Sequence, residues 1–367
     1  MVTRLCIGFV LNPIAGMGGR VGLKGTDGWA YKEAIRRGAL PVAPERAERA
    51  FAALKSSEIS DKVFFYTSAP PMGERVLSHH GFDYAVVYRP KSKRTTADDT
   101  RECVRVFENF GVDMVVFCGG DGTARDVCSV IGDRIPMIGI PAGVKMFSSV
   151  FLRMPEDLAS VIECYLERRE CRDGEVMDVD EERYRGGELS ARPYFVAKIP
   201  CGDVVQDAKA VFYGDDYSGI AEYIVEKFGR KCAYILGPGG TLRAIKEYLG
   251  VSNPTMLGVD VVFGDKVWKD CNEREILSIL NNTPCAYIVV SPIGAQGFIF
   301  GRGNQQISAR VIRKVGMENV IVVAGESKAR NTPMLFVDTG DKELDNQFRG
   351  YMKVITGYGR HIVIPVG

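Results

Sequence analysis

The sequence is poor in histidine and lacks the cysteine spacing of a metal site. Only His79, His80 and His361 occur among 367 residues, and the ten cysteines form no Cys-x-x-Cys pair. Structural zinc sites are built from closely spaced Cys and His ligands. We therefore do not expect a zinc site.

Most of the cysteines are predicted to fill the hydrophobic core. A free cysteine behaves as a small buried hydrophobe, and several of them lie in apolar runs. These are Cys6, Cys118, Cys232 and Cys285. A disulfide stays open as an alternative, and the sequence does not say which cysteines it would pair.

The chain also lacks a large net charge and a long apolar run. Its 47 basic and 46 acidic residues leave a formal net charge of +1, so we expect no nucleic-acid partner. No run reaches the length that crosses a bilayer. The apolar residues 5–11 are too short for a signal peptide and are not followed by a typical cleavage site, so they are interpreted as the first strand. We expect a cytoplasmic protein with small-molecule substrates and no membrane partner.

Strand-like and helix-like segments alternate through the first 150 residues. This alternation predicts a doubly wound parallel sheet with helices on both faces. Short β-like runs broken by glycine and proline follow, and they predict a β-rich mixed second domain. The expected domains are residues 1–150, residues 151–335, and a terminal segment 336–367 that could return to the first domain.

The most informative stretch is an apolar strand, residues 114–118, that ends at Gly119-Gly120-Asp121-Gly122-Thr123. The glycines would let a ligand reach backbone N–H groups, and the helix that follows would direct its positive end at phosphate. The carboxylate of Asp121 could hold Mg²⁺ or accept a proton from an attacking hydroxyl. The structural alternative is a tight turn in which Asp121 caps the helix.

Two further loops follow predicted strands. The first contains Asn12, Gly16, Gly18 and Gly19. It fits neither a Walker A loop nor Gly-x-Gly-x-x-Gly, so it is either an ordinary loop or a phosphate contact. The second runs from Pro141 through Gly143 to a predicted helix start at residues 145–147. Because the carboxyl ends of parallel strands share one edge, the three loops are expected to converge.

The run Gly119–Thr123 resembles the signature of the NAD kinase, diacylglycerol kinase and sphingosine kinase superfamily. Its extension to Asp126 is similar to the ATP-NAD kinase-like branch that includes acetoin-catabolism protein X. The resemblance implies a two-domain, homo-oligomeric kinase that uses ATP and Mg²⁺. It would transfer a phosphoryl group to the 2′-OH of NAD, with Asp121 as the proton acceptor. Arg125, Lys145 or Lys24 could supply positive charge.

The resemblance is looser in the second half. Family members carry an Asn-Glu pair on a strand, where this chain has Val259-Asp260. A Thr-Pro-Thr-Gly-Ser-Thr loop corresponds to residues 291–297, which include Gly294 and Gln296. Asn304, in a polar glycine-rich loop, is a further candidate for binding a sugar, amide or base.

These departures concern the acceptor and leave the phosphoryl-transfer loop unchanged. A kinase for a different hydroxyl compound is therefore one alternative, and a nucleotide-binding regulator without turnover is another. A second strand–glycine–helix unit at residues 232–249 is a weaker phosphate-site candidate, since its loop lacks an acidic or lysine companion.

Overall fold

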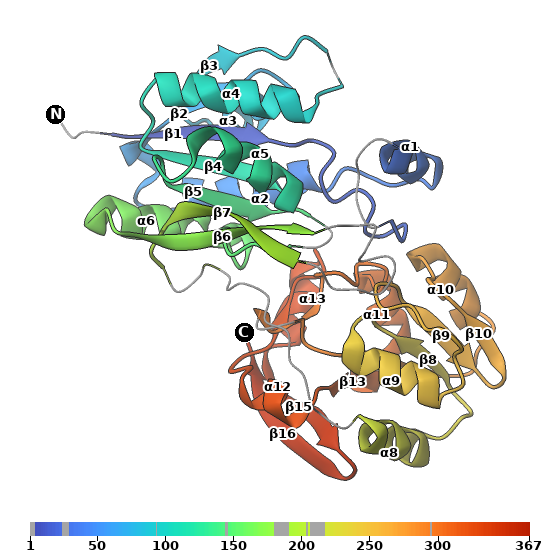
Figure 1. Cartoon of the computed structure of the whole chain (residues 1–367). Helices are drawn as coiled ribbons and strands as arrows, with labels where there is room; N and C mark the ends of the chain where they lie inside the picture. The colour runs from blue at the N-terminus through green and yellow to red at the C-terminus, as the bar shows by residue number, and fades with distance from the viewer. Residues whose placement is uncertain are drawn as a thin grey trace. The chain divides into compact units, whose positions relative to one another are not determined.

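The computed structural model describes residues 4–23, 29–92, 94–143, 146–179, 191–202, 205, 217–293 and 296–367 (Figure 1). The chain forms two compact units. The first unit comprises Met1–Met17, Gly25–Ile35 and Leu40–Ala208. The second comprises Gly18–Lys24, Arg36–Ala39 and Lys209–Gly367.

The first unit is built on a five-stranded sheet in the order β3-β2-β1-β4-β5, in which all neighbouring strands are parallel. Its strands are β1 (Leu5–Leu11), β2 (Val63–Ser68), β3 (Tyr84–Tyr88), β4 (Met114–Gly119) and β5 (Met137–Pro141). The chain winds from β1 to β3 on one side and then restarts at β4 on the other side of β1. The predicted doubly wound parallel sheet is confirmed.

Helices cover both faces of this sheet. They are α2 (Ala43–Lys55), α3 (Glu74–His79), α4 (Ala97–Asn109), α5 (Asp121–Ile131) and α6 (Leu158–Arg168), and α1 (Trp29–Arg36) precedes them in the chain. The ring of Phe51 in α2 packs 4.5 Å from that of Phe9, whereas Phe107 of α4 covers the neighbouring Gly8. Because successive strand residues face opposite sides, α2 and α4 lie on opposite faces.

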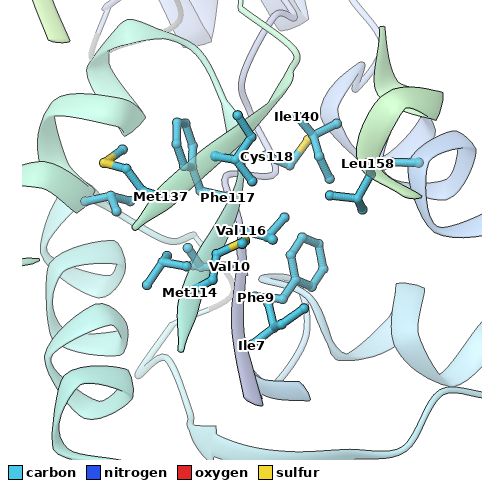
Figure 2. Packing of buried hydrophobic residues seen from close by; sticks show 14 of the residues in the cluster. Ile7, Phe9, Val10, Met114, Val116, Phe117, Cys118, Met137, Ile140 and Leu158 are labelled. Atoms are coloured by element: carbon cyan, nitrogen blue, oxygen red, sulfur yellow. The ribbon is translucent and has the colours of Figure 1, made fainter. Parts of the chain in front are cut away.

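The core of the first unit is formed mainly by the central strands. Figure 2 shows side chains of β1, β4 and β5, with Leu158 of α6, packed around one another. Residues Met114–Cys118 are fully buried. Both faces of β4 are therefore covered, as its unbroken apolar sequence predicts.

The first unit extends beyond the expected boundary at residue 150. An antiparallel hairpin of β6 (Cys171–Val179) and β7 (Ala191–Pro200) contributes Val176, Ala197 and Ile199 to the same core. The change in sequence character after Leu152 therefore marks a hairpin within the first unit.

The second unit contains a seven-stranded mixed sheet in the order β10-β9-β8-β11-β13-β15-β16. The four strands β8, β11, β13 and β15 are parallel, and the strands outside them are antiparallel. The bounds are β8 (Ala233–Leu236), β9 (Asp260–Phe263), β10 (Lys266–Trp268), β11 (Ala286–Val290), β13 (Val320–Val323), β15 (Gly350–Gly357) and β16 (Arg360–Val366). A short pair, β12 (Phe298–Phe300) and β14 (Phe336–Val337), is also parallel. The predicted mixed second sheet is confirmed.

Helices pack on both faces of this second sheet. They are α8 (Ser218–Phe228), α9 (Gly240–Tyr248), α10 (Glu273–Leu280), α11 (Ala309–Val315), α12 (Glu326–Arg330) and α13 (Lys342–Gln347). Tyr234 and Leu236 share a cluster with α8 and α9, whereas Ala233 and Ile235 share one with α10 and α11. Among the described residues, no helix combines the length and apolar character that crossing a membrane requires.

Two expectations for the second unit are corrected. The terminal segment does not return to the first unit, because β15 pairs with β13 and β16 pairs with β15. Cys232 and Cys285 are joined in a disulfide instead of filling the core. They immediately precede Ala233 and Ala286, which are paired residues of neighbouring parallel strands, and this register brings the two Cα atoms to 4.7 Å.

Candidate active site

The candidate site lies in the first unit at the carboxyl ends of β1, β4 and β5. The winding direction changes between the neighbouring strands β1 and β4. In open α/β sheets, ligands bind in the crevice outside the strand ends at such a switch point. Asn12 follows β1 there, and Gly120 follows β4.

Hydrogen bonds join the first two loops. The backbone N–H of Asn12 donates to the carbonyl of Cys118 over 2.9 Å. Its side-chain Nδ2 donates to Oγ1 of the buried Thr123, also over 2.9 Å. Asn12 and Thr123 are thus brought together as the sequence predicted, and each fixes the position of the other.

The third loop packs against the glycines that follow β4. The N–H groups of Ala142 and Gly143 both donate to the carbonyl of Gly119, over 2.9 and 3.1 Å. A Cβ on Gly120 would lie 2.9 Å from the Cα of Gly143. Glycine at position 120 therefore permits an approach of two backbones that a larger residue would block.

Gly16 completes the contact between the first and third loops. It has a φ of +79°, and a Cβ there would lie 2.0 Å from the carbonyl oxygen of Ala142. Both the left-handed conformation and the close contact require glycine at this position.

Helix α5 begins at Asp121, two residues earlier than its sequence suggests, with Gly120 as its N-cap. The N–H groups of the first helical turn have no partner within a helix. These groups belong to Asp121, Gly122 and Thr123, and Gly122 is exposed. Together with the positive end of the helix dipole, they form a surface suited to phosphate.

The carboxylate of Asp121 accepts hydrogen bonds from the segment after the third loop. Its Oδ2 accepts from the N–H of Phe147 over 2.7 Å. Its Oδ1 accepts from the N–H and Oγ of Ser148 over 3.1 and 2.6 Å. Three donors suit an ionised carboxylate, which can only accept hydrogen bonds. These hydrogen bonds anchor Asp121. The residue is only half-buried, so part of it lies at the loop surface.

Ser148 links this carboxylate to the hairpin. Its fully buried Oγ accepts from the N–H of Met177 in β6 over 2.9 Å while it donates to Asp121. The predicted helix start at residues 145–147 is not borne out at the described positions 146 and 147, which are not helical. The following segment is instead tied to β5 by backbone bonds between Gly139 and both Val150 and Leu152.

The cysteine that precedes the loop is not suited to nucleophilic chemistry. Cys118 is fully buried, and its thiol donates to the carbonyl of Ala43. Burial raises the pKa of Cys118 above its ordinary value, so the thiol stays protonated at neutral pH. Asp121 is therefore the ionisable side chain of this loop that can take part in proton transfer.

Other residues predicted to bind the cofactor are placed differently. Gly18 and Gly19 belong to the second unit, where a Cβ on Gly19 would meet the side chain of Gln305 at 3.2 Å. Arg125 lies in the second turn of α5 and is half-buried. Lys145 and Lys24 lie outside the described residues.

Asp260, a predicted substrate contact, is fully buried in the second unit. Its Oδ2 lies 3.0 Å from Nζ of Lys246, and neither side chain is exposed. Thr255 and the N–H of Asp270 also donate to its carboxylate, over 2.8 to 3.2 Å. This carboxylate therefore serves internal contacts and exposes no atom to a ligand.

The other predicted substrate residues lie in two loops of the second unit. Asn304 is buried and closes its own loop, accepting from the N–H of Gly301 over 3.0 Å and donating to the carbonyl of Ile299 over 2.8 Å. Gln296 is also buried, with its N–H bonded to the carbonyl of Ile293. Gly294 lies outside the described residues.

Sequence reasoning missed Phe147, Ser148 and Lys246. The first two contact Asp121 from 26 and 27 residues away. A pair of serines after a glycine turn carries no distinctive signal. For Lys246, a lysine in the apolar face of a predicted helix could have suggested a buried partner.

Comparison with known families identifies the family of both halves of the chain. The ATP-NAD kinase N-terminal domain matches residues 7–170, and the ATP-NAD kinase C-terminal domain matches residues 231–366. The chain belongs to the ATP-NAD kinase family. The predicted resemblance to this family is therefore confirmed for both halves of the chain.

Similarity to individual proteins adds little to this assignment to the ATP-NAD kinase family. No curated protein matches the sequence. The crystal structure of UDP-N-acetylglucosamine 2-epimerase matches at 13% identity, over 37% of this chain and 33% of the epimerase. Its TM-score of 0.19 is too low to bear on the fold or the chemistry.

Proposed function

We propose that the protein transfers the γ-phosphoryl group of ATP to the 2′-OH of NAD and so forms NADP. The observation that carries the proposal is the loop Gly119–Thr123, which lies at the switch point of the first sheet and opens α5. Membership of the ATP-NAD kinase family supports the same reaction class.

The backbone of this loop would bind the phosphates. The N–H groups of Gly122 and Thr123 lie in the first turn of α5, where anions are favoured. Asn12 ties the first loop to it, and Gly16 packs the first loop against the third. Mg²⁺ would enter with the triphosphate, since this ion is commonly held by one or two carboxylates and by substrate phosphates.

Asp121 would accept the proton of the attacking hydroxyl. An alcohol is almost fully protonated at neutral pH, and a positioned general base contributes typically ~10²–10⁴-fold in rate. The hydrogen bonds from Phe147 and Ser148 would hold the carboxylate in place for this step. The remaining acceleration would come from positioning and from neutralisation of charge on the phosphates.

A second candidate is a kinase of the same family that acts on a different hydroxyl compound. It is favoured by Asp260, which stands where the family's Asn-Glu pair is expected and is fully buried against Lys246. With this carboxylate unable to bind a ribose, other groups must select the acceptor.

The test is a kinase assay with magnesium and ATP labelled on the γ-phosphate. It compares NAD with a panel of nucleosides, sugars and polyols. Labelled NADP as the main product would support the first proposal, and a labelled product from another acceptor would support the second. Binding of ATP or NAD by calorimetry without any labelled product would contradict both and indicate a regulator.

We also propose that the protein works in the cytoplasm as a homo-oligomer. The proposal extends the family resemblance, and light scattering on the purified chain tests the assembly. A monomer at micromolar concentration would contradict it.

A further inference from the structure

Three side chains with metal-binding atoms converge on the surface of the first unit. Glu48 lies on α2, His79 is the last residue of α3, and His80 follows it. One oxygen of Glu48, Oε2, lies 2.8 Å from Nδ1 of His79 and 2.7 Å from Nε2 of His80. The three ligand atoms lie within 4.8 Å of one another.

The two imidazoles reach the same oxygen in different ways. Adjacent residues at the end of a helix point in different directions. His79 therefore presents the ring nitrogen nearer its backbone, and His80 the farther one. The side chain of His80 is 16% exposed, whereas that of His79 is 70% exposed. His80 is therefore held largely by packing, whereas the exposed His79 is held by its contact with Glu48.

Neighbouring cations on α2 are engaged with other groups. Nε and Nη2 of Arg49 donate to Glu156 over 2.9 and 3.2 Å. Nζ of Lys55 donates to the carbonyl of Gly81 over 3.0 Å. The carboxylate of Glu48 is thus directed at the imidazoles, although a cationic side chain is next to it in sequence.

We propose that Glu48, His79 and His80 form a binding site for a borderline divalent metal ion of the zinc type. Two imidazoles and one carboxylate are a common three-ligand set for Zn²⁺, with the fourth position left to water. Ligand bonds of about 2.0–2.2 Å in a tetrahedron place the ligand atoms about 3.4 Å apart. Side-chain rotations that lengthen the two contacts of Glu48 from 2.8 and 2.7 Å by about 0.6–0.7 Å, and set the two ring nitrogens at the same spacing, would meet this requirement.

The spacing of the residues explains why the sequence did not suggest the site. Glu48 precedes His79 by 31 positions, and the two helices bring them together. A bound ion would tie the end of α3 to α2. Because it would bind the folded first unit only, it would stabilise that unit.

The experiment is a titration of the metal-free full chain with Co²⁺, followed by its visible absorption, and with Zn²⁺, followed by calorimetry. The variants Glu48→Gln, His79→Ala and His80→Ala are compared with His361→Ala, which removes the remaining histidine. The exposed position of His79 makes its variant a safe one for folding.

The expected result is one tetrahedral Co²⁺ per chain in the parent and in His361→Ala. Binding should weaken at least tenfold in each of the three cluster variants. Added Zn²⁺ should raise the melting temperature of the parent but not of His79→Ala. Absence of binding by the parent, or unchanged binding in Glu48→Gln, would overturn the proposal and leave only a hydrogen-bonded cluster.

Discussion

Replacing Lys246 with methionine should destabilise the second unit strongly. Nζ of Lys246 donates to the carbonyls of Thr255 and Gly258 over 2.9 and 3.0 Å and lies 3.0 Å from Asp260. Methionine keeps an unbranched apolar chain but supplies no donor. The substitution would leave a carboxylate of zero exposure without its cation.

The expected cost is about 3–5 kcal/mol, the usual range for breaking a buried pair by removing one partner. A typical domain has a total stability of about 5–15 kcal/mol, so this loss should shift the urea midpoint of the second unit clearly. Because two units can unfold separately, tryptophan fluorescence and circular dichroism should both be recorded. The two tryptophans lie in different units, Trp29 in the first and Trp268 in the second, so each reports on the unfolding of one unit.

A second substitution, Asp260→Asn, tests whether the loss comes from the unpaired carboxylate. The double variant with Asp260→Asn removes both charges and should recover part of the lost stability. The Michaelis constant for NAD should change little in Asp260→Asn at temperatures where the variant is folded. If Asp260→Asn kept the parent's stability and raised this constant tenfold, the carboxylate would act on the substrate and the structural role would be refuted.

Three further predictions concern other contacts. Ser148→Ala removes a buried hydroxyl that joins Asp121 to β6, and it should cost about 1–3 kcal/mol in urea unfolding with a lower catalytic rate; unchanged values of both would contradict the anchoring role. Reduction of the disulfide between Cys232 and Cys285, which are 53 positions apart, should lower the stability of the second unit by about 4 kcal/mol, measured by melting with and without reductant; an equal melt would contradict it. Burial raises the pKa of Cys271 from 9.0 to about 12. The contribution of its neutral thiol to the free energy of unfolding is therefore intact below pH 9 and is lost as the pH rises toward 12. Cys271→Ala should flatten this part of the pH–stability curve, and an unchanged slope would argue against it.

Local sequence signals predicted the first unit well. The apolar run Met114–Cys118 is buried on both faces, as expected of a central parallel strand. Thr96 and Asp99 form the predicted cap of α4, with the N–H of Thr96 donating to Asp99 over 2.8 Å. Periodicity and capping depend on near neighbours, and the sequence displays these directly.

Contacts between residues far apart in the chain could not be predicted from the sequence. The partners of Asp121 come from residues 147 and 148, and the partner of Cys232 lies beyond five intervening elements. Such pairings depend on strand order and register, which the local sequence does not reveal. For the same reason, Asp260 was predicted to face a ligand although it faces Lys246.

The most direct test of the central claim is the rate of NADP formation by Asp121→Asn at saturating ATP and NAD, with ATP binding measured in parallel. Asparagine keeps the size of the side chain and one oxygen, which can accept from Ser148 in place of Oδ1, but it cannot take up the hydroxyl proton. We predict that ATP binding stays within a few-fold of the parent while the rate falls by about 10²–10⁴-fold. A variant that forms NADP as fast as the parent would contradict the role of Asp121 as the general base.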